Sequence, residues 1–288
     1  PRLDRSQERY GAVISRFAAV LLRAFLVVLL IALPSLLLPG VNSDAAQIVA
    51  LVSIFAATLV IFEYASAYPG LVEFRDAPPF NRVRFASLFI TVLLITLITR
   101  GLYDPSALTR FLTAVGALIG LAIDFPYSPV RLVVLMLPPD TSPEHLSLVR
   151  TLAGIAYLSS LLTLAVFLIV LRLKGWPNSK GSFNVWINLP TFDPTAGGDV
   201  VERLERDARF NIALGFLLPF LTPAVIKAAS STFGSLSLDH PQTLIWTMSA
   251  WAFLPASMIM RGMATLRIAG LIVEKRRAYS TSETTQAA

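Results

Sequence analysis

The 288-residue chain contains no cysteine and only two histidines, His145 and His240. Without cysteine it can form no disulfide bond, thiolate metal site or thiol nucleophile. Both histidines lie in predicted loops beside prolines, so neither is placed to ligate a haem or a chlorophyll-type pigment inside a membrane. We therefore expect no cofactor and no metal site.

Charged residues and catalytic motifs are also scarce. Only 15% of the residues are charged, whereas 55% are hydrophobic, and the mean hydropathy is +0.67. The sequence has no Gly-x-Ser-x-Gly motif, no phosphate-binding P-loop and no His-Glu-x-x-His motif. An enzyme is therefore the least favoured class of function, and we expect no catalytic residues.

Long apolar runs dominate the remaining sequence. A helix needs about 20 apolar residues to cross a hydrocarbon core roughly 30 Å thick. Six runs reach or approach this length, which predicts an all-α, polytopic membrane protein that forms a single membrane domain over residues 1–288. The runs are residues 17–38, 46–62, 85–99, 146–171, 210–226 and 243–260.

The basic residues indicate how such a protein is oriented. Of the 24 Lys and Arg residues, 18 fall in four hydrophilic segments. Basic loops stay on the cytoplasmic side, so this pattern predicts a bacterial-type inner (plasma) membrane protein with both termini in the cytoplasm. The net charge of +6 then reflects topology and attraction to anionic lipids, and we expect no binding to nucleic acid. The segments are the N-terminal tail 1–16, the loops 63–84 and 172–209, and the C-terminal tail 261–288.

A seventh apolar run, residues 107–125, conflicts with the even number of crossings that this orientation requires. Arg110 and Asp124 lie near its two ends, where they can reach the headgroups. Either the run does not cross, or it pairs with the short run 130–137, which gives eight passes or a re-entrant loop. Eight helical residues cover only about 12 Å. Among six to eight helices we therefore favour six full spans with one short or re-entrant element in 107–139.

The loop 63–84 is the first candidate for a functional surface. It interleaves acids, bases and aromatic residues around Pro78 and Pro79, which suits charge-assisted contacts with a protein partner or with lipid headgroups. In the alternative interpretation, the arginines only anchor the third span and the acids are their local ion-pair partners. The predicted contact residues are Glu73, Arg75, Asp76, Arg82 and Arg84.

Two further features point to packing or docking. Gly116 and Gly120 form a Gly-x-x-x-Gly motif, which lets a second helix approach closely. That helix belongs either to a partner or second copy, or to the same bundle, and internal packing is the simpler explanation. The loop 172–209 is too short for a catalytic domain. It offers either a docking surface or a stalk that extends the next helix.

These observations favour an accessory, assembly or scaffold subunit of a larger inner-membrane complex. Its expected partners are membrane lipids and either other membrane protein subunits or further copies of itself. The first alternative is a transporter or channel for small molecules or lipids. Ion-coupled carriers usually hold charges near the bilayer centre, and the charges in or beside the apolar runs lie within reach of an interface.

Overall fold

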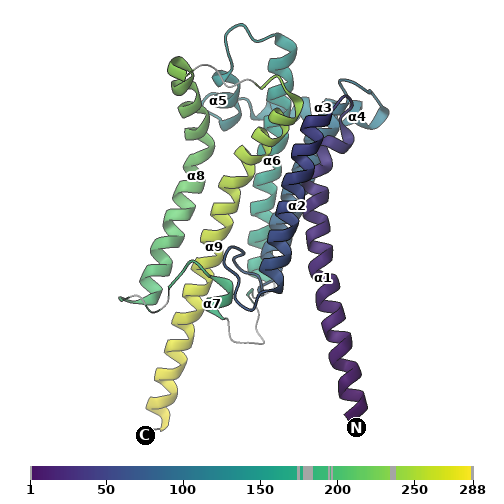
Figure 1. Cartoon of the computed structure of the whole chain (residues 1–288). Coiled ribbons are helices and arrows are strands. Elements are labelled where there is room, and N and C mark those ends of the chain that lie inside the picture. Colours follow the sequence, from purple (N-terminus) through teal and green to yellow (C-terminus); the bar gives the residue numbers. More distant parts are fainter. Residues whose placement is uncertain are drawn as a thin grey trace. The chain divides into compact units, whose positions relative to one another are not determined.

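The computed structural model describes residues 2–173, 176, 177, 184–193, 195, 197–233 and 238–286. The structure is 79% helix, and the described residues contain no strand. The predicted all-α class is therefore confirmed (Figure 1). The helices are α1 (Arg2–Leu37), α2 (Ser43–Ala65), α3 (Phe80–Arg100), α4 (Ala107–Ile123), α5 (Pro129–Met136), α6 (Pro143–Leu173), α7 (Val185–Asn188), α8 (Val200–Phe233) and α9 (Pro241–Gln286).

Six of these helices contain stretches that are long and apolar enough to cross a membrane, as expected for a multi-pass membrane protein. Five of the six predicted runs lie within one of them, and the first, 17–38, ends one residue beyond α1. Polar or charged residues at their ends extend the helices beyond the runs, so α2 and α3 reach 23 and 21 residues. The stretches are Ile14–Leu37, Ser43–Ala65, Phe80–Arg100, Pro143–Leu173, Val200–Ser230 and Pro241–Ser280.

The chain divides into two compact units, which are described separately. The first comprises Pro1–Asp76 and Asn184–Asp193. In it α1 and α2 pack against each other as a helical hairpin. Asn42 caps the start of α2, because its Oδ1 accepts the backbone N–H of Ala45 at 2.7 Å.

The second unit comprises Ala77–Phe183 and Pro194–Ala288 and contains α3 to α6, α8 and α9. Helices α8 and α9 approach each other closely where α8 carries Gly215. A Cβ atom at Gly215 would lie 2.6 Å from the carbonyl oxygen of Pro255. Without a hydrophobic drive for helix association in lipid, such small residues allow close backbone packing.

Proline 223 removes one backbone hydrogen bond inside α8, and a side chain of α9 replaces it. Pro223 has no N–H to donate to the carbonyl of Pro219, four residues earlier. The Trp251 indole N–H donates to that oxygen at 3.1 Å, and the bond is buried. The freed carbonyl is thus satisfied within the bundle, as an apolar environment requires.

Helix α9 continues far beyond the length needed to span a membrane. It has 46 residues, and the predicted C-terminal tail 261–288 is helical as far as Gln286. Arg276 donates a hydrogen bond of 2.9 Å to Asp199, just before α8. That bond lowers the pKa of the Asp199 carboxyl below its ordinary value.

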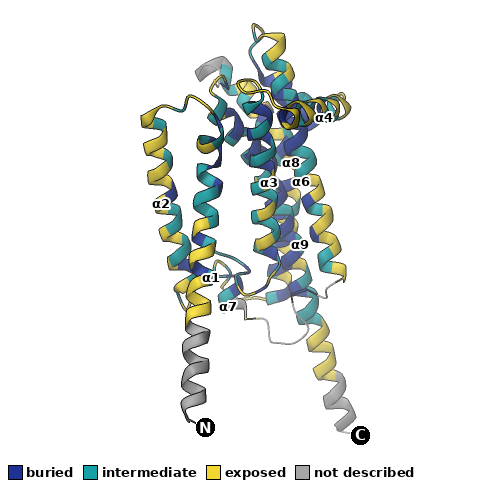
Figure 2. Ribbon diagram, turned by 90° about the vertical axis from the view of Figure 1, so that its right-hand side faces the viewer, coloured by how far each residue is buried: buried dark blue, intermediate teal, exposed yellow. Residues whose placement is uncertain are grey.

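The short helices α4 and α5 occupy the region where the sequence left the number of crossings open. Thr109 and Gly116, two turns apart on α4, lie beside Gly101 and Ile98 at the end of α3. Helix α4 therefore crosses the end of α3 instead of running back along it. Figure 2 shows α4 lying across the long helices of its unit. This arrangement agrees with the favoured count of six long helices and one short element.

Candidate functional site

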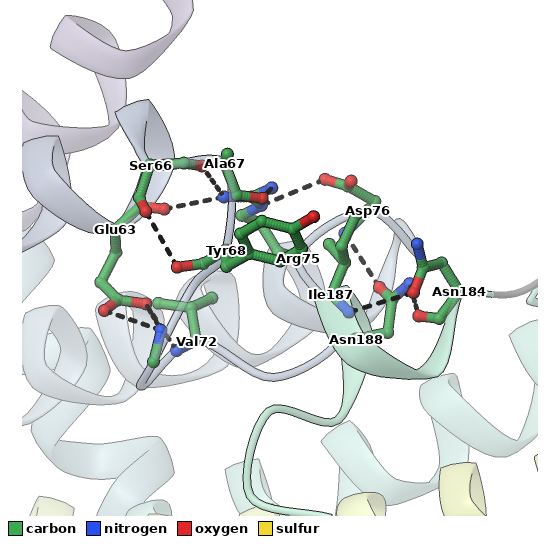
Figure 3. A network of polar contacts seen from close by, with 11 residues as sticks. Glu63, Ser66, Ala67, Tyr68, Val72, Arg75, Asp76, Asn184, Ile187 and Asn188 are labelled. Carbon is green, nitrogen blue, oxygen red and sulfur yellow. Dashed lines mark hydrogen bonds and ion pairs between the residues drawn. The ribbon is translucent and has the colours of Figure 1, made fainter. Parts of the chain in front are cut away.

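The loop that follows α2 contains a dense network of polar contacts (Figure 3). Glu63, in the last turn of α2, is buried although it carries a carboxylate. Its two oxygens accept the backbone N–H groups of Gly70, Leu71 and Val72, each at 3.0–3.1 Å. A carboxylate that accepts several backbone donors is stabilised in its charged form. The loop therefore folds around the Glu63 side chain.

Arg75 fixes the same loop from the other side. Its Nη1 donates to the carbonyl oxygens of Glu63 and Ser66, at 2.9 and 2.7 Å. Its Nε lies 3.3 Å from Asp76 Oδ1, and only 10% of its side chain is exposed. The guanidinium thus satisfies carbonyls at the end of α2, where cations are favoured. The guanidinium therefore points into its own loop.

A distant segment of the chain, residues 184–193, completes this region. The N–H of Phe74 donates to the Asn188 carbonyl at 2.7 Å, and the N–H of Asp76 donates to Asn188 Oδ1 at 3.1 Å. The Thr191 hydroxyl donates to Glu73 Oε1 at 3.0 Å. We name the residues 63–76 and 184–193 together the loop platform.

Phe74 holds the centre of the loop platform. Its side chain is fully buried, and its φ of 52° lies in the left-handed region, which is unusual for a bulky residue. Such a conformation persists when surrounding contacts determine it. The bond from its N–H to Asn188 is one of these contacts. The loop platform is therefore a specified structure, although it consists largely of loop residues.

The second unit carries the remaining part of both predicted loops. The indole N–H of Trp176 donates to the Ala77 carbonyl at 3.0 Å, in a buried position. Its ring lies beside Phe80 and Phe167, with centroids 6.4 and 6.2 Å away. Residues of the loop 63–84 thus contact residues of the loop 172–209 in the first unit, and other residues of the same two loops contact each other in the second. This is the arrangement expected if both lie on one side of the membrane.

The five predicted contact residues have different surroundings. Glu73, Arg75 and Asp76 bond within the loop platform, as described above. Arg84 lies over the ring of Phe80, with its Cζ 5.4 Å from the centroid, and Arg82 is exposed at the start of α3. Whether these residues contact a partner or lipid stays a prediction. Arg82 is the arginine among them that the structure leaves most open.

The sequence did not identify Glu63, Asn188 or Trp176 as structural residues of this region. Glu63 directly follows the apolar run 46–62, and its position in the sequence does not show that its carboxylate turns back into the loop. Asn188 lies 112 residues from its bonding partner Asp76, and no spacing rule connects such distant positions. The only sequence feature that pointed to a contact between these two loops was that both are rich in aromatic residues.

A second ionic cluster lies between the short helices and α6. Asp124, which ends α4, has a side chain only 5% exposed, and each of its oxygens pairs with an arginine. Arg131 Nε lies 2.8 Å from Oδ1, and Arg150 Nε lies 2.8 Å from Oδ2. These pairs tie the end of α4 to α5 and α6. That Asp124 lies within reach of the headgroups stays a prediction.

The motif Gly116 and Gly120 contacts α6 of the same chain. A Cβ at Gly116 would lie 2.9 Å from the Thr151 side chain, and one at Gly120 would lie 2.9 Å from the Arg150 carbonyl. A Cβ at Gly154 would lie 2.6 Å from the Gly120 Cα. This face of α4 is filled by internal packing.

The loop platform and the Asp124 cluster each hold separate segments of one unit together. Within the described residues, no group of three His, Cys, Asp or Glu side chains could hold a metal ion. Glu63 and Arg75 bond to backbone groups, and Asp124 pairs with two arginines. The chain matches no family model, no curated protein and no solved structure.

We expect Arg75→Gln to loosen the loop platform, because glutamine cannot replace the two short bonds to Glu63 and Ser66. Hydrogen bonds to a charged group contribute about 1.5–3 kcal/mol each at most, so the loop should open measurably. Chymotrypsin should cleave after Tyr68 or Leu71 faster than in the wild type. The matched control is Arg82→Gln, at an exposed arginine of the same segment. Equal cleavage rates in the two variants would contradict the role given to Arg75.

Proposed function

We propose that this protein is an accessory, assembly or scaffold subunit of a larger inner-membrane complex, without a redox cofactor of its own. The observation that carries the proposal is the exposure of α2. Only 6% of its most apolar stretch is buried, the lowest share among the six long helices. Figure 2 shows α2 largely in the colour of exposed residues.

Large side chains form a regular stripe along the exposed side of α2. Ile48, Leu51, Phe55 and Phe62 are 63–69% exposed. Their spacings of three, four and seven residues place them on one face of the helix, opposite the buried Ser53. This spacing is the one by which helices pack side by side in coiled coils and membrane bundles. The stripe thus offers a ready contact for a helix of another subunit.

The loop platform supports the same proposal from the end of α2. Glu63 accepts backbone N–H groups of the loop, and Arg75 donates to a backbone carbonyl at the end of α2, so the two side chains fix the end of α2 to the loop. A partner would therefore meet a preformed surface, which reduces the entropy lost on binding. The basic loops and tails support a cytoplasmic position for this surface.

A transporter is the first alternative, and a membrane enzyme is the second. A carrier for polar solutes needs a polar site near the middle of the membrane. The cavity found in the second unit has an almost wholly apolar lining. It therefore offers a polar solute few binding groups, and the scaffold function is better supported than a carrier for polar solutes.

Purification in mild detergent tests the proposal through the α2 stripe. Phe55→Ala with Phe62→Ala should remove most of the protein that co-purifies with the wild type, because aromatic residues dominate the binding energy of many interfaces. Both side chains are exposed, so the fold and the membrane insertion should persist.

The matched control is Phe210→Ala with Phe216→Ala on α8, since those side chains are equally exposed, at 64% and 63%. The control variant should retain its partner. Loss of the partner in both variants, or in neither, would contradict the assignment of the contact to α2.

A further inference from the structure

The second unit contains an apolar cavity of about 400 Å³ between α5, α8 and α9. Its walls include Val133 and Met136 of α5, Thr222 and Ile226 of α8, and Trp251 and Leu254 of α9. Almost all of the lining surface is apolar. In Figure 1 these three helices come together at the end of the unit where α5 lies.

Prolines in both long helices help to form this cavity. Pro223 and Pro255 line it, one from α8 and one from α9. Each removes a hydrogen-bonding N–H and replaces it with an apolar ring. On α8 the carbonyl that Pro223 leaves free is already bound by Trp251. The carbonyl that Pro223 leaves free is thus satisfied, and the almost wholly apolar lining favours an apolar occupant.

One positive charge lies beside residues that line the cavity. Lys227 directly follows Ile226 and has an exposed side chain. Its Nζ donates to the carbonyl of Leu137, at the end of α5, at 3.2 Å. Among the described residues no carboxylate lies within 4.0 Å of this ammonium group. The bond to Leu137 therefore holds this cation close to Met136 and Ile226 of the apolar cavity, with no carboxylate partner in the described part of the chain.

We propose that the cavity binds an acyl chain of an anionic phospholipid and that Lys227 binds its phosphate. The volume lies within the roughly 300–1,000 Å³ that is usual for small-molecule sites. A partner helix, about 10–12 Å across with its side chains, does not fit. An apolar chain joined to a phosphate complements an apolar cavity with a cation at its edge. This inference is independent of the scaffold function, because it concerns other helices.

The test measures which lipids the purified full chain retains in detergent. Native mass spectrometry would compare phosphatidylglycerol with phosphatidylcholine of the same acyl chains. The wild type should prefer phosphatidylglycerol about fivefold, the equivalent of ~1 kcal/mol for one lysine near a phosphate. In Lys227→Gln this preference should disappear. The control Lys275→Gln removes an exposed charge on α9 and should retain the preference.

A second variant tests the cavity itself. Ala250→Leu adds an apolar side chain to the lining and should lower retention of both lipids severalfold. Ala114→Leu, at an exposed position of α4, is the control and should leave retention unchanged. Glycerol phosphate, which has the phosphate without the chains, should not displace the lipid. An unchanged preference in Lys227→Gln would overturn the proposal, as would unchanged retention in Ala250→Leu or displacement by glycerol phosphate.

Discussion

Replacing Gly154 by alanine should destabilise the second unit by about 1–3 kcal/mol, the usual cost of inserting a methyl group into a filled contact. The added Cβ would lie 2.6 Å from the Gly120 Cα and 2.9 Å from its nitrogen. Both are backbone atoms, so no side-chain rotation can relieve the overlap, and α4 must move away from α6. The midpoint of thermal unfolding in detergent should fall by several degrees.

Gly270→Ala is the matched control for this substitution. Gly270 lies in α9, and a Cβ there would meet no atom within 4 Å. In a helix, alanine is intrinsically favoured over glycine by about 1 kcal/mol, so the control should keep or raise the midpoint. An equal fall in both variants, or no fall for Gly154→Ala, would show that α4 does not pack on α6 as described.

Asp124→Asn should have the second large effect, about 3 kcal/mol of lost stability. Removing one partner from a buried ionic cluster typically costs 3–5 kcal/mol, because it leaves the remaining charges unpaired. We expect the lower end of that range, since the side chains of Arg131 and Arg150 are 38% and 22% exposed and retain some solvation. Loss of the cluster should also release α5, so proteases should cleave between α4 and α5.

A surface ion pair and a compensating substitution provide the controls. Asp104→Asn breaks the pair with Arg100, in which both side chains are well exposed, and should cost less than about 1 kcal/mol. Adding Arg150→Met to Asp124→Asn should recover part of the loss, because one unpaired cation is then removed. If Asp104→Asn and Asp124→Asn were equally mild, the Asp124 cluster would contribute little to stability.

The sequence predicted most of the fold because membrane-spanning helices depend on local composition. A run of apolar residues must form a helix to satisfy its own backbone in lipid, so the six runs and the six long helices coincide. The ends were less well predicted. For example, α9 continues through a charged region to Gln286, where hydropathy gives no signal for helix.

The candidate site was only partly accessible to sequence reasoning. The loop 63–84 was singled out for its charges, yet Arg75 is almost enclosed by carbonyls of its own loop. Composition shows that an arginine is present but does not show which way it points. The direction of the Arg75 side chain is determined by backbone carbonyl groups. Every residue has such a group, so the sequence does not identify these partners. The contact of Gly120 with Gly154, between α4 and α6, likewise depends on how helices cross.

Crosslinking in intact membranes tests the scaffold function most directly. A photoreactive amino acid placed at Phe55 on the α2 stripe, and one placed at Phe216 on α8 as the control, would each report what lies beside these equally exposed positions. If α2 docks on another subunit, position 55 should yield a defined adduct with a different polypeptide, whereas position 216 should yield mainly lipid adducts. Lipid adducts alone at position 55, or adducts only to further copies of this chain, would contradict an accessory subunit that docks through α2.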